Sequence, residues 1–122
     1  MGIAAKLRGL FMAKGRAMNL KDRLLQEYKF LNFLYSTEEG LLIFGTYPPE
    51  DGELKAAKVP ELLKILRGIG DADFYQIRVG DRIYCVGLVT SNVFFFGERK
   101  KAINSREFEE IREYTKHELE LV

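Results

Sequence analysis

The sequence predicts an α+β domain in which strands joined by tight turns alternate with helices. Three observations support this class. Residues 74–97 divide into three short apolar segments at turn residues, and residues 30–47 form a further apolar pair. Helical periodicity occupies the stretches before, between and after these two blocks. The expected order is α-β-β-α-β-β-β-α, preceded by one extra helix.

Composition fits one globular domain. The chain has 122 residues, of which 47% are hydrophobic and 30% charged, enough for a hydrophobic core and unlike a disordered chain. No stretch of about 18 consecutive apolar residues occurs, so we expect no membrane-spanning helix. The N-terminus lacks the continuous apolar run of a secretory signal. We therefore expect a cytoplasmic protein, with peripheral membrane attachment as an option.

Positive charge is concentrated at the N-terminus. Residues 1–24 carry six Lys or Arg against one Asp, whereas residues 25–122 carry 13 against 17 Asp or Glu. We expect residues 1–18 to form a basic amphipathic helix that extends a domain spanning residues 19–122. Its expected contacts with a membrane or a partner are Ile3, Lys6, Leu7, Arg8, Leu10 and Phe11.

Two other roles for this basic helix remain open. It can pack on its own domain or on a dimer mate, or it can approach nucleic-acid phosphate together with Arg99, Lys100 and Lys101. The chain does not interleave aromatic and basic residues in the RNA-binding manner, because Phe94, Phe95 and Phe96 lie in an apolar strand. Nucleic acid is therefore the least favoured partner.

The first helix of the domain is expected to start at Asn19, an N-cap residue with Asp22 three positions later. A hairpin follows, with strands at residues 30–35 and 41–47 and a turn in which Gly40 supplies a positive φ. Both strands are apolar at nearly every position. This pattern indicates a sheet that is covered on both faces.

The second half of the chain is expected to contain a helix, three strands and a last helix. Residues 48–52, PPEDG, predict a break, and Pro60 is placed in the first turn of a helix that ends at Gly68 or Gly70. Strands are expected at residues 74–79, 82–89 and 93–96, with Gly80 and Asp81 forming a two-residue turn. The last helix has Asn104 and Glu107 as a capping box. Its expected buried stripe is Phe108, Ile111, Thr115, Leu119 and Val122.

No catalytic or metal-binding constellation is recognisable. Cys85 lies in an apolar run and is interpreted as buried, and His117 lies on the polar face of the last helix. Glu109 and Glu113 share one face of that helix, and an acidic bias near the helix start, favoured by the helix dipole, explains them more simply than a site does. The chain has neither a glycine-rich phosphate loop nor a nucleophile elbow. We therefore expect no enzymatic activity, no cofactor and no metal.

The order of elements resembles the Roadblock family, the dynein light-chain Roadblock-like domains, over residues 19–122. The most telling local similarity is LLQEYKFLNFLYSTEEGLLIFG, residues 24–45, in which a helix runs into a hydrophobic strand, an acidic turn with glycine and a second strand. The family usually approaches its first strand through a segment containing glycine, and this chain has KFLN at residues 29–32. Profilin-like and longin domains share much of this layout.

The resemblance implies a five-stranded antiparallel sheet with the central helix on one face and the terminal helices on the other. It also implies a homodimer in which third strands and central helices pair across a two-fold axis. Such pairing would cover an apolar edge strand, which could otherwise pair with other chains and aggregate. The expected dimer residues are Leu62, Leu63, Leu66, Tyr75, Ile77 and Val79.

The function that the resemblance implies is that of a non-enzymatic homodimeric adaptor or regulator, acting on a Ras-like small GTPase. One alternative is a peripheral membrane-binding or trafficking module, similar to longin domains, that uses the basic N-terminal helix. A third is a small-ligand sensor of profilin-like build, which requires an internal pocket.

Overall fold

The structure is a computed structural model, and it describes residues 16–121, with side chains from Asn19 onward. The contact residues expected between Ile3 and Phe11 lie outside this range, as does Val122.

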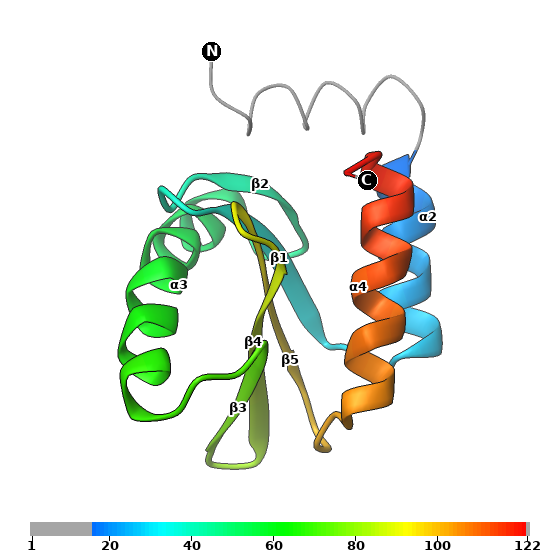
Figure 1. Ribbon diagram of the computed structural model, residues 1–122. Coiled ribbons are helices and arrows are strands. Elements are labelled where there is room, and N and C mark those ends of the chain that lie inside the picture. The colour runs from blue at the N-terminus through cyan, green and yellow to red at the C-terminus, as the bar shows by residue number, and fades with distance from the viewer. Residues whose placement is uncertain (1–15, 122) are drawn as a thin grey trace.

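Five antiparallel strands form one sheet in the order β2-β1-β5-β4-β3. Helix α3 covers one face of the sheet, and α2 and α4 lie side by side on the other (Figure 1). This arrangement confirms the expected α+β architecture. The strands are β1 (Asn32–Thr37), β2 (Leu42–Gly45), β3 (Phe74–Val79), β4 (Arg82–Thr90) and β5 (Val93–Arg99). The helical elements are α2 (Arg16–Asp22), a π-helical turn η1 (Arg23–Glu27), α3 (Pro49–Ile69) and α4 (Ser105–Leu119).

The central strands are buried on both faces, as their continuous apolar character predicts. Phe33 and Phe95 belong to the cluster on the side of α2 and α4, which also holds Phe108 and Ile111 of α4. Leu34 and Phe94, their neighbours in sequence, belong to a second cluster on the side of α3. Successive strand residues point to opposite faces, so these two central strands, β1 and β5, need apolar side chains at nearly every position.

The expected break at residues 48–52 is wrong, because α3 begins at Pro49. Proline suits the first helical position, and Glu50 and Asp51 in the first turn complement the helix dipole. The placement of Pro60 in a first turn is also wrong, since Pro60 lies inside the helix. Proline leaves the carbonyl four residues earlier without its helical donor. That carbonyl belongs to Ala56, and Ser36 Oγ of β1 lies 3.4 Å from it.

The start of the first helix also differs from the expectation. Arg16 is already helical, so Asn19 lies inside α2 and does not cap it. Leu20, Leu24 and Tyr28 are buried, which confirms the helical period. Lys29 then adopts a left-handed conformation with φ of 63° and turns the chain toward β1. Residues with a side chain rarely adopt this conformation.

Strand ends differ by a few residues, whereas the turns follow the expectation. β1 begins at Asn32 rather than at residue 30, β2 is limited to residues 42–45, and β5 continues three residues past Phe96. Gly40 and Gly80 have positive φ values of 85° and 64°. At α4, Asn104 accepts a hydrogen bond from Glu107 N at 2.8 Å and donates one to Glu107 Oε1 at 3.2 Å, which confirms the capping box.

Candidate interaction surface

The outer face of α3 carries large apolar side chains in solvent. Leu54, Ile65 and Ile69 are 61%, 63% and 81% exposed. Ala56, Val59 and Leu63 on the opposite side of the helix pack against the sheet. A helix that is apolar on both sides has a second surface to cover, and contiguous exposed apolar side chains mark interaction sites in soluble proteins.

Strand β3 forms the edge of the sheet nearest the end of α3 (Figure 1). Leu88 N donates to Asp73 O at 2.9 Å, which makes these opposing residues a hydrogen-bonded pair. Because such pairs alternate along an antiparallel ladder, the backbone groups of Phe74, Gln76 and Arg78 point away from β4. The edge is therefore open to a further strand within the part of the chain that the structure describes.

Tyr75 connects the end of α3 to this edge. Its hydroxyl donates to Gly70 O at 2.7 Å and accepts from Ala72 N at 2.9 Å, which fixes the loop between the two elements. On the other face of β3, the Gln76 side chain donates to Ile103 O and accepts from Ile103 N, both at 2.7 Å. The edge strand is thus held in place from both faces.

The expected dimer residues differ in how far they are exposed to solvent. Val79 is 59% exposed, and Leu62, Leu66, Tyr75 and Ile77 are partly buried. Leu63 is a core residue that packs between α3 and the sheet, so it does not belong to an outer surface. The sequence did not identify Leu54, Ile65 and Ile69 as surface residues, because a helical period alone does not say which apolar stripe faces the sheet.

Arg99 at the end of β5 does not act as one group with Lys100 and Lys101, which follow it. Arg99 is 2% exposed, and its guanidinium is hydrogen-bonded to the carbonyls of Tyr28, Lys101 and Ala102 and to the Glu107 carboxylate. It is therefore unavailable to a nucleic-acid phosphate, contrary to the expectation. Lys100 and Lys101 are exposed.

Cys85 and His117 lie where the sequence places them. Cys85 is buried, and burial raises the pKa of its thiol to about 12, so it does not provide a thiolate near neutral pH. His117 is exposed on α4. No group of three or more His, Cys, Asp or Glu side chains suited to a metal occurs within residues 16–121. None of the described helices is long and apolar enough to cross a membrane.

Comparisons with known proteins identify the fold. No family model matches the chain, and no curated protein does. Among solved structures, MglB from Myxococcus xanthus matches with a TM-score of 0.65 at 13% identity, over 88% of this chain and 90% of that one. The gliding protein MglB from Thermus thermophilus matches with a TM-score of 0.64 at 11% identity, over 88% and 91%. A Roadblock/LC7 domain from Streptomyces avermitilis gives 0.58 at 12% identity, over 76% and 82%.

These neighbours confirm the Roadblock resemblance at the level of the fold. The chain has a Roadblock/LC7-like α+β fold, and its five strands and covering helices are those that the resemblance implies.

Proposed function

We propose that this protein is a non-enzymatic, cytoplasmic homodimer that acts as an adaptor or regulator of a Ras-like small GTPase. The observation that carries the proposal is that the exposed Ile65 and Ile69 lie at the end of α3 that Tyr75 ties to the open edge of β3. Each feature alone favours association, and Tyr75 joins them into one surface.

A two-fold axis beside β3 would cover both features at once. Two copies of β3 would pair edge to edge, and the exposed side chains of α3 would meet those of the second α3. An isologous contact of this kind removes an open sheet edge without exposing a new one. An MglB structure with a tetrameric arrangement, matched at a TM-score of 0.57 and 12% identity over 88% of this chain and 85% of that one, offers a precedent for self-association on this fold.

The small GTPase partner follows from the Roadblock resemblance. A dimer built on this fold presents a rigid two-fold surface of helices and sheet. Such a surface regulates a switch protein when it contacts one nucleotide state better than the other, because only differential affinity shifts a conformational equilibrium.

Binding to purified Ras-like GTPases from the same organism tests this function. Each GTPase is loaded with GDP or with a non-hydrolysable GTP analogue and titrated by calorimetry. We expect one GTPase to bind, with unequal affinities in its two states. If the protein is shown to be dimeric and no GTPase binds to it, the regulatory role is contradicted. A scaffold function would then remain.

A further inference from the structure

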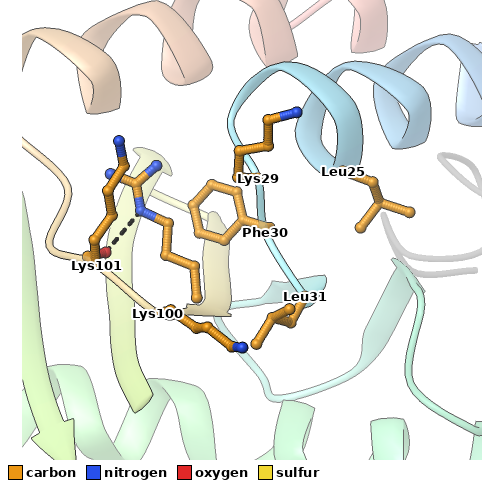
Figure 2. Close-up of a pocket in the computed structure, with 7 residues that line it drawn as sticks. Leu25, Lys29, Phe30, Leu31, Lys100 and Lys101 are labelled. Atoms are coloured by element: carbon orange, nitrogen blue, oxygen red, sulfur yellow. Dashed lines mark hydrogen bonds between the residues drawn. The ribbon is translucent and has the colours of Figure 1, made fainter. Parts of the chain in front are cut away.

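A groove of about 470 Å³ lies between the loop that precedes β1 and the loop that follows β5 (Figure 2). This volume is in the range of pockets that bind small ligands or a few side chains. The groove is on a different part of the molecule from the proposed dimer surface. Its lining residues are Leu25, Lys29, Phe30, Leu31, Arg99, Lys100 and Lys101.

The lining combines an apolar floor with a cationic rim. The ring of Phe30 occupies the middle of the groove, with Leu31 beside it and Lys29, Lys100 and Lys101 around it (Figure 2). Among the described residues, no ion pair joins any of these three lysines to a carboxylate. The charge of Lys101 does help to lower the pKa of Glu107, so Lys101 interacts electrostatically with that carboxylate as well. The rim therefore keeps a positive charge that a ligand can neutralise.

Arg99 fixes both walls of the groove. Its Nη1 donates to Tyr28 O on one loop at 2.7 Å, and its Nη2 and Nε donate to the carbonyls of Ala102 and Lys101 on the other at 2.6 and 2.9 Å. Leu31 N adds a hydrogen bond to Glu98 O at 2.8 Å. The walls are thus held at a fixed separation, and a preformed site reduces the ordering cost of binding.

We propose that this groove docks an acidic segment of a partner protein, with an apolar side chain against Leu25 and Leu31 and carboxylates at the lysine rim. The positive rim stands out because residues 25–122 as a whole carry more acidic than basic side chains. The complementary ligand is therefore both apolar and acidic.

The shape of the site favours a protein segment over a membrane. Leu25 is partly buried in the groove, so a flat lipid surface would not reach it, and Phe30 at the base of the groove is only 3% exposed. A bilayer would touch the lysines and Leu31, and the recess between them would remain empty. A side chain that projects from a peptide reaches the floor and the rim together.

Fluorescence anisotropy with labelled model peptides tests the proposal. The probe carries a phenylalanine flanked on each side by two glutamates. One comparison peptide replaces the glutamates by glutamine, and another replaces the phenylalanine by glycine. We expect the probe to bind more tightly than both, and its affinity to fall with added salt.

The double variant Lys100→Glu/Lys101→Glu is expected to weaken probe binding by about tenfold or more, because it reverses two rim charges. Lys100→Arg/Lys101→Arg keeps the charges and should bind as the parent does. Lys64→Glu, an exposed lysine on α3 across the sheet, is the matched control for charge reversal.

Equal binding of the glutamate and glutamine peptides, or of the parent and the double variant, would overturn the proposal. So would binding to vesicles of anionic phospholipid that the double variant loses while no peptide binds, because the site would then recognise a membrane. The peptide measurement needs neither a dimer nor a GTPase, so its outcome is independent of the function proposed above.

Discussion

The buried guanidinium of Arg99 forms a bidentate ion pair with the carboxylate of Glu107. Its Nη2 lies 2.9 Å from Oε1, and its Nη1 lies 3.2 Å from Oε2. Arg99 ends β5, and Glu107 lies in the first turn of α4 and completes its capping box. The pair therefore joins the sheet to the helix, and the same guanidinium holds Tyr28 before β1. One buried cation thus joins β5 and the start of α4 to the segment before β1, about 70 residues earlier in the chain.

Glu107→Gln is expected to lower the free energy of unfolding by about 2 kcal/mol at pH 7, because it leaves the buried Arg99 without a counter-charge. The hydrogen bonds from Arg99 hold the pKa of Glu107 below its ordinary value. A carboxyl whose pKa is lower in the folded protein stabilises the fold above its unfolded pKa, about 4.3. That contribution disappears as the pH falls through the folded pKa.

Urea unfolding of the parent and of Glu107→Gln at pH 7, 5 and 3 measures this dependence. The difference between the two proteins should shrink below about pH 4.3, where the Glu107 carboxyl takes up a proton in the unfolded chain but still resists protonation in the folded protein. A difference that is the same at pH 7 and pH 3 would contradict the assignment. Glu113→Gln is the control, since Glu113 is 64% exposed and lies 3.7 Å from Lys116 Nζ, and we expect it to change stability by less than about 0.5 kcal/mol.

Two glycine substitutions should have opposite effects on stability. A Cβ at Gly87 would lie 2.5 Å from Cζ of Phe108 and 2.8 Å from Cβ of Phe74, where those rings stack between sheet and helix. Gly87→Ala should therefore destabilise the protein by about 2 kcal/mol. A Cβ at Gly68 on α3 meets nothing within 4 Å, so Gly68→Ala should stabilise the helix by about 0.5–1 kcal/mol. Chemical denaturation at equal protein concentrations compares them, and a Gly87→Ala variant as stable as the parent would refute the packing.

Cys85 should resist thiol reagents in the folded protein. It is 2% exposed, and its pKa of about 12 leaves almost no thiolate at pH 8. We expect incorporation of iodoacetamide, followed by mass spectrometry, to be slow in buffer and complete within minutes in concentrated urea. Rapid stoichiometric labelling without urea would show that the cluster beneath α4 opens readily.

Apolar-to-charged changes on the outer face of α3 should disrupt self-association without unfolding the protomer. Ile65→Asp and Ile69→Asp place a charge on side chains that are 63% and 81% exposed, so the core is unaffected. We expect each to shift the protein toward a monomer in sedimentation velocity, because desolvating the charge opposes the contact. Leu41→Asp changes a side chain that is 50% exposed near the β1–β2 turn, and it should leave the association state of the parent unchanged.

The features that could be predicted from the sequence are those fixed by local chemistry. The capping box of Asn104 and Glu107, the positive φ of Gly40 and Gly80, and the continuous apolar character of the central strands each depend on neighbours in the chain. The edge position of β3 was expected from the Roadblock resemblance. These signals, taken with the order of elements, were sufficient for the fold.

The errors arose where tertiary contacts outweigh local preference. A proline at position 60 predicts a helix start, but α3 continues through it because Val59 and Leu63 on either side pack against the sheet. The same packing buries Leu63 and leaves Ile65 and Ile69 outside. The role of Arg99 was also hidden, because its partners Tyr28 and Glu107 meet it only in the folded protein.

A second copy of this chain is expected to cover the exposed face of α3 and the edge of β3. Multi-angle light scattering behind gel filtration at micromolar concentration tests it most directly. We expect a mass of twice 14.1 kDa for the full chain. A mass of 14.1 kDa across the micromolar range would contradict it.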